Sequence, residues 1–154
     1  MPGTWILVAD SARARLFSLS AGATGLEEIG DFINAAARTP GHELEHAQPA
    51  RVHDRFGSNR HAIDARTPPR TKAAAQFAEV LKAALERGQA ELRFHDLVLV
   101  APPRFLGVLN STLGPRLCER VLLRVAKNLT RRPASEIAEA LPHTLSRRRA
   151  MAIG

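Results

Sequence analysis

Two short runs of consecutive apolar residues predict the central strands of a β-sheet. They span residues 4–9 and 94–101 and are rich in β-branched and large aliphatic side chains, as is typical of strands buried on both faces. Residues 13–20 and 26–33 predict two further strands, joined by a short Ala/Gly/Thr turn. The chain is therefore expected to begin with an antiparallel meander.

Helical spacing of apolar residues begins after residue 70. The stripe within 71–88 predicts an amphipathic helix with Gly88 as its C-cap. A second helix is expected from Phe105, interrupted at Gly114 and Pro115; residues 116–125 predict a helix end that passes into a short strand, and a last helix starts at Pro133 and runs to Leu141. Strands that alternate with crossover helices predict an α/β fold with a mixed sheet flanked by helices.

The chain length predicts a single domain. Its 154 residues are enough for one compact core; we assign residues 1–145 to this domain and 146–154 to a basic tail. Residues 34–69 have little periodicity, and so long an irregular stretch in a small domain is usually functional or disordered. No segment approaches the ~20 apolar residues that cross a bilayer. The amino-terminal residues carry no basic signal region, and Cys118 is the single cysteine, so we expect a cytoplasmic protein without membrane insertion.

The charge balance points to an anionic partner. There are 22 Lys and Arg against 15 Asp and Glu, which gives a net charge of +7, and nineteen of the basic residues are arginine. Arginine suits bidentate contacts to phosphate, and a basic domain attracts polyanions. The alternative is a codon-usage bias in a chain that is also rich in alanine.

Residues 42–46, His-Glu-Leu-Glu-His, match the H-E-x-x-H pattern of zinc hydrolases. That chemistry needs a rigid, buried helix, whereas proline and glycine flank this segment, so we expect a solvated loop and no metal or other cofactor. Incidental metal capture by these histidines with His53 and His61 is the alternative. Gly88-Gln89 matches two-thirds of the Gly-Gly-Gln tripeptide of release factors, but capping alone accounts for this glycine. Cys118 is expected in the core.

Polar residues follow the predicted strands at their carboxyl ends. Asp10 follows the first apolar run, Arg104 follows the second, and Lys127 follows the short strand. Ligands of α/β sheets gather at this edge when the strands are parallel neighbours, and residues 54–57, Asp-Arg-Phe-Gly, would reach over it. The alternative is structural, with Asp10 capping a turn and Arg104 capping a helix.

Three stretches together resemble one bacterial family, the "protein required for attachment to host cells". They are Trp5-Ile-Leu-Val-Ala-Asp10-Ser-Ala-Arg13-Ala-Arg15-Leu-Phe17, then Asp54-Arg55-Phe56-Gly57, and Leu97-Val-Leu-Val-Ala-Pro-Pro-Arg-Phe-Leu-Gly107 with Lys127-Asn-Leu-Thr130. The resemblance covers about residues 4–141. It implies kinship with bacterial relatives of the archaeo-eukaryotic peptide release factors, the fold of their middle domain, and contact with tRNA or the ribosome.

The chain departs from the family pattern in three places. The segment 34–70 holds no Gly-Gly-Gln, which argues against peptidyl-tRNA hydrolysis. Asn128 stands where the family usually has aspartate, and the family's Asp-x-x-Gly-Arg loop is shortened, with Ser58 after Gly57.

These observations predict a non-enzymatic module that binds tRNA or ribosomal RNA through a basic face. One alternative is a protein-binding factor required indirectly for attachment to host cells. Another is a hydrolase that uses Asp10, Asp54 and loop histidines. The binding residues that we predict are Asp10, Arg13, Arg15, Asp54, Arg55, Gly57, Arg60, Arg104 and Lys127.

Overall fold

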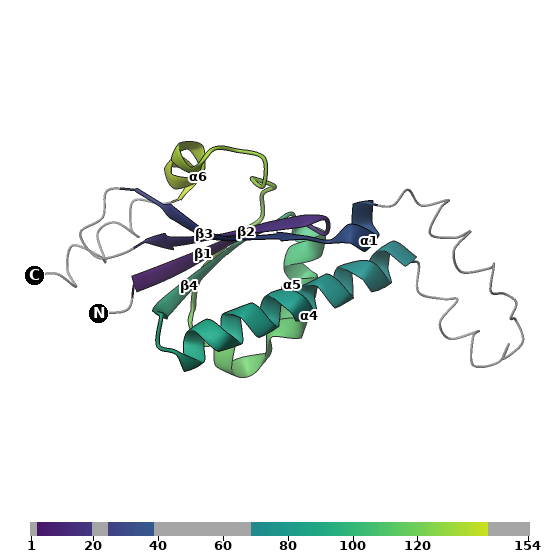
Figure 1. Ribbon diagram of the computed structural model, residues 1–154, viewed down its shortest axis with the longest axis horizontal. Coiled ribbons are helices and arrows are strands. Elements are labelled where there is room, and N and C mark those ends of the chain that lie inside the picture. Colours follow the sequence, from purple (N-terminus) through teal and green to yellow (C-terminus); the bar gives the residue numbers. More distant parts are fainter. Residues whose placement is uncertain (1–2, 20–24, 39–68, 142–154) are drawn as a thin grey trace, which may run out of the picture.

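The computed structural model describes residues 3–19, 25–38 and 69–141, which form one α/β domain (Figure 1). The strands are β1 (Gly3–Ala9), β2 (Arg13–Leu19), β3 (Glu27–Ile33), β4 (Phe94–Val100) and β5 (Val121–Val125). The helices are α1 (Ala35–Arg38), α4 (Pro69–Ala90), α5 (Pro103–Cys118) and α6 (Ala134–Ala140). The predicted mixed sheet flanked by helices is confirmed.

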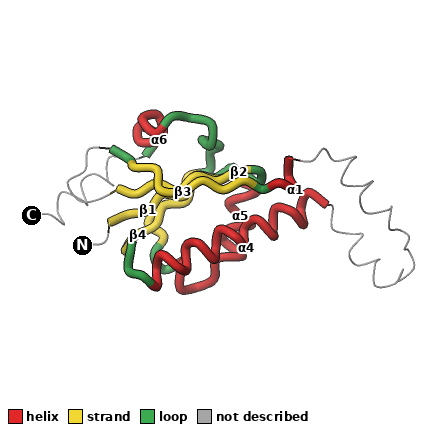
Figure 2. The backbone as a smooth tube through the Cα atoms, viewed as in Figure 1, coloured by secondary structure: helices red, strands yellow, loops and turns green. Residues whose placement is uncertain are grey.

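The sheet has five strands in the order β3-β2-β1-β4-β5 (Figure 2). The meander β1-β2-β3 is antiparallel, as predicted, because short connections join neighbours. Strand β4 runs parallel to β1, and β5 runs parallel to β4. Helix α4 returns the chain before β4, and α5 returns it between β4 and β5. The two apolar runs of the sequence are therefore the strands that lie at the centre.

Helices cover both faces of the sheet. Helices α4 and α5 lie on one face and α6 on the other (Figure 1). Alternate residues of β1 serve the two layers: Leu7 packs in the core under α4 and α5, whereas Val8 packs with Ile137 of α6. Cys118 packs at the edge of the first core, as expected.

Helix α4 does not end where the sequence predicted. It runs to Ala90, so Gly88 is not its C-cap. The backbone N–H of Arg93 donates to the carbonyl of Gly88, and Leu92 takes the left-handed conformation with φ 57°. Gly88 instead lies against the ring of Trp5, where a β-carbon has no room. The glycine therefore serves helix-to-sheet packing.

The predicted interruption of α5 is confirmed at Gly114. This residue has φ 83° and ψ 170°, and Pro115 begins the second helical piece. That piece continues to Cys118, and β5 follows after a two-residue turn.

Several predictions fall outside the described residues. They concern the H-E-x-x-H motif at 42–46, the segment 54–57 with Arg60, and the basic tail 146–154. In the part of the chain that the structure does describe, no helix has both the length and the hydropathy that a bilayer crossing needs.

Candidate functional site

The carboxyl ends of three parallel strands lie side by side at one end of the sheet. Val100 of β4 pairs with Val8 of β1 and with Val125 of β5. The predicted neighbourhood of the two apolar strands is thus confirmed. Asp10, Arg104 and Lys127 follow these strands at the same end, but no hydrogen bond or ion pair joins their side chains.

Asp10 has the structural role that we gave as its alternative. Its Oδ1 accepts hydrogen bonds from the backbone N–H groups of Ala12 and Arg13, both at 2.8 Å, and so caps the turn between β1 and β2. Its Oδ2 lies 3.0 Å from the hydroxyl of Thr130, which is buried. The Asp10 carboxylate therefore also links the segment after β5 to the turn between β1 and β2.

Asn128 shares the Thr130 hydroxyl with Asp10. Its Oδ1 lies 2.9 Å from Oγ1 of Thr130 and accepts from the Thr130 backbone N–H at 3.3 Å. One hydroxyl proton thus faces two acceptors. A neutral amide at position 128 avoids placing a second negative charge beside Asp10.

Arg15 is held by protein groups on three sides. Its guanidinium donates to both carboxylate oxygens of Glu28 at 2.9 and 3.0 Å, and to the carbonyls of Thr130 and Arg132 at 3.2 and 2.6 Å. It also lies over the ring of Phe17. This arginine joins β2, β3 and the segment after β5, and four of its five N–H donors are already used.

The ion pair between Arg15 and Glu28 shifts the pKa of both groups. The hydrogen bond to Glu28 raises the pKa of Arg15, and the same bond lowers the pKa of Glu28. Arg13 makes a looser pair with Asp31 at 3.4 Å, in which both side chains are well exposed. The two arginines of β2 therefore face the carboxylates of β3.

Arg104 and Lys127 remain open to solvent. Arg104 lies in the first turn of α5, where Pro102 is the N-cap and no side chain caps the helix. Lys127 is exposed directly after β5. Neither side chain has a partner among the described residues. The predicted helix-capping role of Arg104 is wrong.

The structure adds a basic surface that strand-end reasoning missed. Within residues 103–132, one glutamate accompanies seven arginine and lysine residues. All seven are exposed. Arg131 and Arg132 lie over β2, because the carbonyls of Thr130 and Arg132 accept from Arg15. The other five lie along α5, β5 and the residues that follow each, and we call them the basic edge: Arg104, Arg116, Arg120, Arg124 and Lys127. The charge run was visible in the sequence, but its position along one side of the sheet was not.

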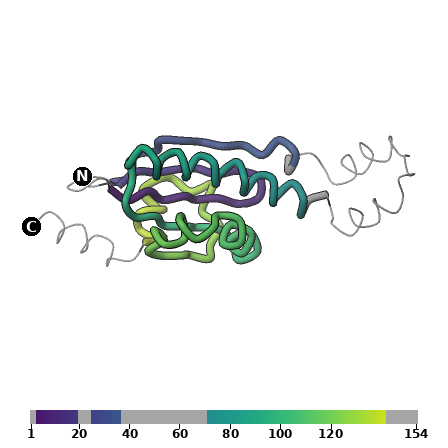
Figure 3. Tube along the Cα trace, turned by 90° about the horizontal axis from the view of Figure 1, so that it is seen from below, coloured from purple at the N-terminus to yellow at the C-terminus, as the bar shows by residue number. Residues whose placement is uncertain are grey.

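The opposite edge of the sheet is acidic. Strand β3 holds three carboxylates and no basic residue. Figure 3 shows β3 along one side of the domain and α5 along the other, and the strand order places β3 and β5 at the two ends. Arg13 and Arg15 of β2 pair with two of these carboxylates, so Glu27 is the acidic residue of β3 that has no ion-pair partner among the described residues.

Two members of the basic edge have polar neighbours. Arg124 donates through Nε to Oδ1 of Asn110 at 2.7 Å, and Arg120 lies 3.3 Å from Nε2 of His95. These neighbours are neutral or weakly basic, so the positive charge is not cancelled. Among the described residues, no group of three or more His, Cys, Asp or Glu is placed to hold a metal ion.

Comparison with known families decides the identity. The family model described as "protein required for attachment to host cells" matches residues 5–141. This chain belongs to that family. The resemblance inferred from the sequence is thereby confirmed for the host-attachment family, whereas its relation to release factors is not shown.

A solved structure of the Aquifex aeolicus Ppx/GppA phosphatase, type II variant, is similar to this host-attachment family member at 12% identity and a TM-score of 0.40. The similarity covers 81% of this chain and 35% of the phosphatase chain. The protein thus spans about a third of that phosphatase. No curated protein matches the chain.

Proposed function

We propose that this host-attachment family protein binds structured RNA through the basic edge. The observation that carries the proposal is the exposure of five basic side chains along one edge of the sheet, with a single glutamate among them in sequence. Phosphate contacts from arginine and lysine supply most of the affinity for a nucleic acid. The sequence resemblance to release-factor relatives favours tRNA or ribosomal RNA as the partner class.

The proposed RNA-binding surface does not include Arg13 and Arg15, the arginines of β2. Arg15 donates to Glu28 and to two carbonyls, and Arg13 pairs with Asp31. Phosphate would have to displace these acceptors. Arg104 and Lys127 of the predicted set remain, and Arg116, Arg120 and Arg124 join them.

The hydrolase alternative gains no support from Asp10. Its carboxylate already accepts bonds from two backbone N–H groups and faces the Thr130 hydroxyl. A general base needs an oxygen that reaches a substrate proton. We therefore do not extend the proposal to catalysis.

Fluorescence anisotropy with labelled tRNA over a salt series tests the RNA proposal. The triple variant Arg104→Ala, Arg116→Ala and Lys127→Ala removes three charges of the basic edge whose side chains have no partner among the described residues. Each lost phosphate contact lowers the slope of log affinity against log salt by about 0.7 to 0.9. We expect the triple variant to lose about two units of slope and to bind tRNA at least tenfold more weakly.

A matched triple variant on α4 is the control. Lys72→Ala, Lys82→Ala and Arg87→Ala likewise remove three positive charges. All three residues belong to α4 and lie outside the basic edge. This control is expected to keep most of the affinity and slope. Equal losses of affinity in both triple variants would show that tRNA binding depends on the net charge and not on the basic edge. Absence of tRNA binding at low salt would refute the proposal.

A further inference from the structure

The guanidinium group of Arg124 is held at one end and open at the other. Its Nε donates to Oδ1 of Asn110 at 2.7 Å, which joins β5 to α5. A guanidinium group has five N–H donors. The four on the terminal nitrogens of Arg124 have no partner among the described residues, and the side chain is exposed. The protein therefore orients this planar group and leaves its two-pronged end free.

The other side chains of the basic edge are held differently. Arg120 lies with a terminal nitrogen 3.3 Å from Nε2 of His95, so part of its two-pronged end is engaged. The remaining three have no partner among the described residues, and they become ordered only when a ligand binds. Ordering a long side chain costs conformational entropy. Arg124 has already lost much of this freedom through its bond to Asn110.

The group that orients Arg124 carries no charge. Asn110 is an amide, whereas Arg15 of β2 is held by the carboxylate of Glu28. A carboxylate cancels the positive charge that it orients, but an amide leaves that charge intact. Asn110 is itself well placed, because Leu109 beside it in α5 is fully buried. Arg124 thus offers both a fixed direction and a full positive charge.

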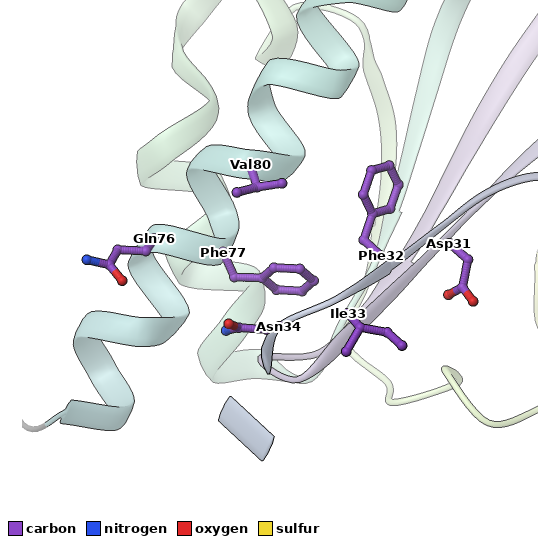
Figure 4. A pocket seen from close by; sticks show the side chains of 7 residues that line it. All are labelled: Asp31, Phe32, Ile33, Asn34, Gln76, Phe77 and Val80. Carbon is purple, nitrogen blue, oxygen red and sulfur yellow. The ribbon is translucent and has the colours of Figure 1, made fainter. Parts of the chain in front are cut away.

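The groove between β3 and α4 offers no comparable contact to an anion (Figure 4). Phe32, Phe77 and Val80 are among the residues that line it, and its charged residue is Asp31. None of the described residues that line this groove is basic. A phosphate there would lose hydration without meeting a positive charge. The groove therefore does not compete with Arg124 as a phosphate site.

We propose that Arg124, oriented by Asn110, is the phosphate anchor of the basic edge. Its two terminal nitrogens donate parallel hydrogen bonds to the non-bridging oxygens of one phosphodiester in the bound RNA. This anchor rests on the proposed function, because it names the contact by which the same surface holds RNA. Arginine matches phosphate oxygens bidentately, whereas lysine acts as a point charge. Arg104, Arg116 and Lys127 then contribute chiefly through their charge.

Arg124→Lys tests the anchor, because it keeps the positive charge and removes the two-pronged end. Fluorescence anisotropy with labelled tRNA should show about tenfold weaker binding than the parent protein. The slope of log affinity against log salt should stay the same, since lysine still neutralises the phosphate. Arg116→Lys is the comparison. Arg116 is exposed and has no side-chain partner among the described residues, so its variant should weaken binding by about twofold or less.

Asn110→Ala tests the positioning role of Asn110. The variant frees Arg124 and should weaken tRNA binding about threefold. It should cause no further loss when residue 124 is already lysine. Such non-additivity is the signature of two residues that act through one contact. Both sites are exposed, and thermal unfolding of each variant checks that the fold is intact.

The results distinguish a wrong anchor from a wrong function. Undiminished tRNA binding by Arg124→Lys, or equal losses in Arg124→Lys and Arg116→Lys, overturns the anchor. An equal loss from Asn110→Ala with arginine and with lysine at position 124 overturns the positioning role. In each of these cases the parent protein still binds tRNA, so the proposed function stands. Failure of the parent protein to bind tRNA at low salt overturns both.

Discussion

Gly88 of α4 lies against the indole ring of Trp5 in β1. A β-carbon at position 88 would come within 2.5 Å of Cζ3 of Trp5 and 3.2 Å of Cε2 of Phe94. Gly88→Ala is therefore expected to lower the free energy of unfolding by about 1 to 3 kcal/mol, because a buried site without room must shift its neighbours. The loss outweighs the gain of about 1 kcal/mol that alanine brings inside a helix. Urea denaturation measures it.

Gly107→Ala in α5 is the control for this prediction. Apart from the adjoining residues and the backbone of its own helix, no atom lies within 4 Å of a β-carbon built at Gly107. The exposed helical site should gain about 0.5 to 1 kcal/mol of stability. If Gly88→Ala stabilised the protein as Gly107→Ala does, the packing role of Gly88 would be wrong.

Gly88 also shows where prediction from the sequence stops. Hydrophobic patterning located β1, β4 and α4 because burial imposes its period on the residues themselves. The role of Gly88 depends on Trp5, which is far away in the sequence. A glycine near a helix end is typical of a C-cap, and the pattern alone does not separate capping from close packing.

The candidate site likewise has one part that the sequence predicts and one part that it does not. Strand-end reasoning placed Asp10, Arg104 and Lys127 at one end of the sheet because the order of strands and helices implies parallel neighbours. The internal role of Arg15 depends on Glu28 and on carbonyls more than a hundred residues away. Only the register of β2 on β3 and the course of the chain after β5 supply these partners. The segment 54–57 lies outside the described residues, so its contribution stays a prediction.

Leu92 occupies a backbone conformation that favours glycine. Its φ is 57° and its side chain is 77% exposed, so it has little packing to lose. Left-handed backbone costs a residue with a β-carbon about 1 kcal/mol or more. Leu92→Gly is expected to raise the free energy of unfolding by about 1 kcal/mol, measured by urea denaturation.

Leu92→Ala separates backbone strain from side-chain loss. Alanine keeps the β-carbon, so this variant should stay close to the parent protein. Equal stabilisation by alanine and glycine would show that the exposed leucine, not the left-handed backbone, is the unfavourable feature.

Arg15 and Arg13 provide a comparison between a held and a loose ion pair. Arg15→Ala removes a two-point bond to Glu28 and leaves the carbonyls of Thr130 and Arg132 without this donor. We expect a loss of about 1 to 2 kcal/mol. Arg13→Ala should cost less than about 0.5 kcal/mol, because its pair with Asp31 is exposed. Similar losses in chemical denaturation would contradict the clamp that we assign to Arg15.

Acid should remove the contribution of Glu28 to stability. The hydrogen bond from Arg15 lowers the pKa of Glu28 in the folded protein, whereas the unfolded chain keeps a pKa of about 4.3. A lowered pKa stabilises the fold above the unfolded value, and this stability is lost as pH falls through the folded pKa. We therefore expect the difference in unfolding free energy between the parent protein and Glu28→Gln to shrink as the pH is lowered from about 7 to about 3. The pKa of Arg15 is raised from an already high value, so it adds no pH dependence in this window. A difference that stays constant or widens on acidification would show that Glu28 gains nothing from its charge in the folded protein.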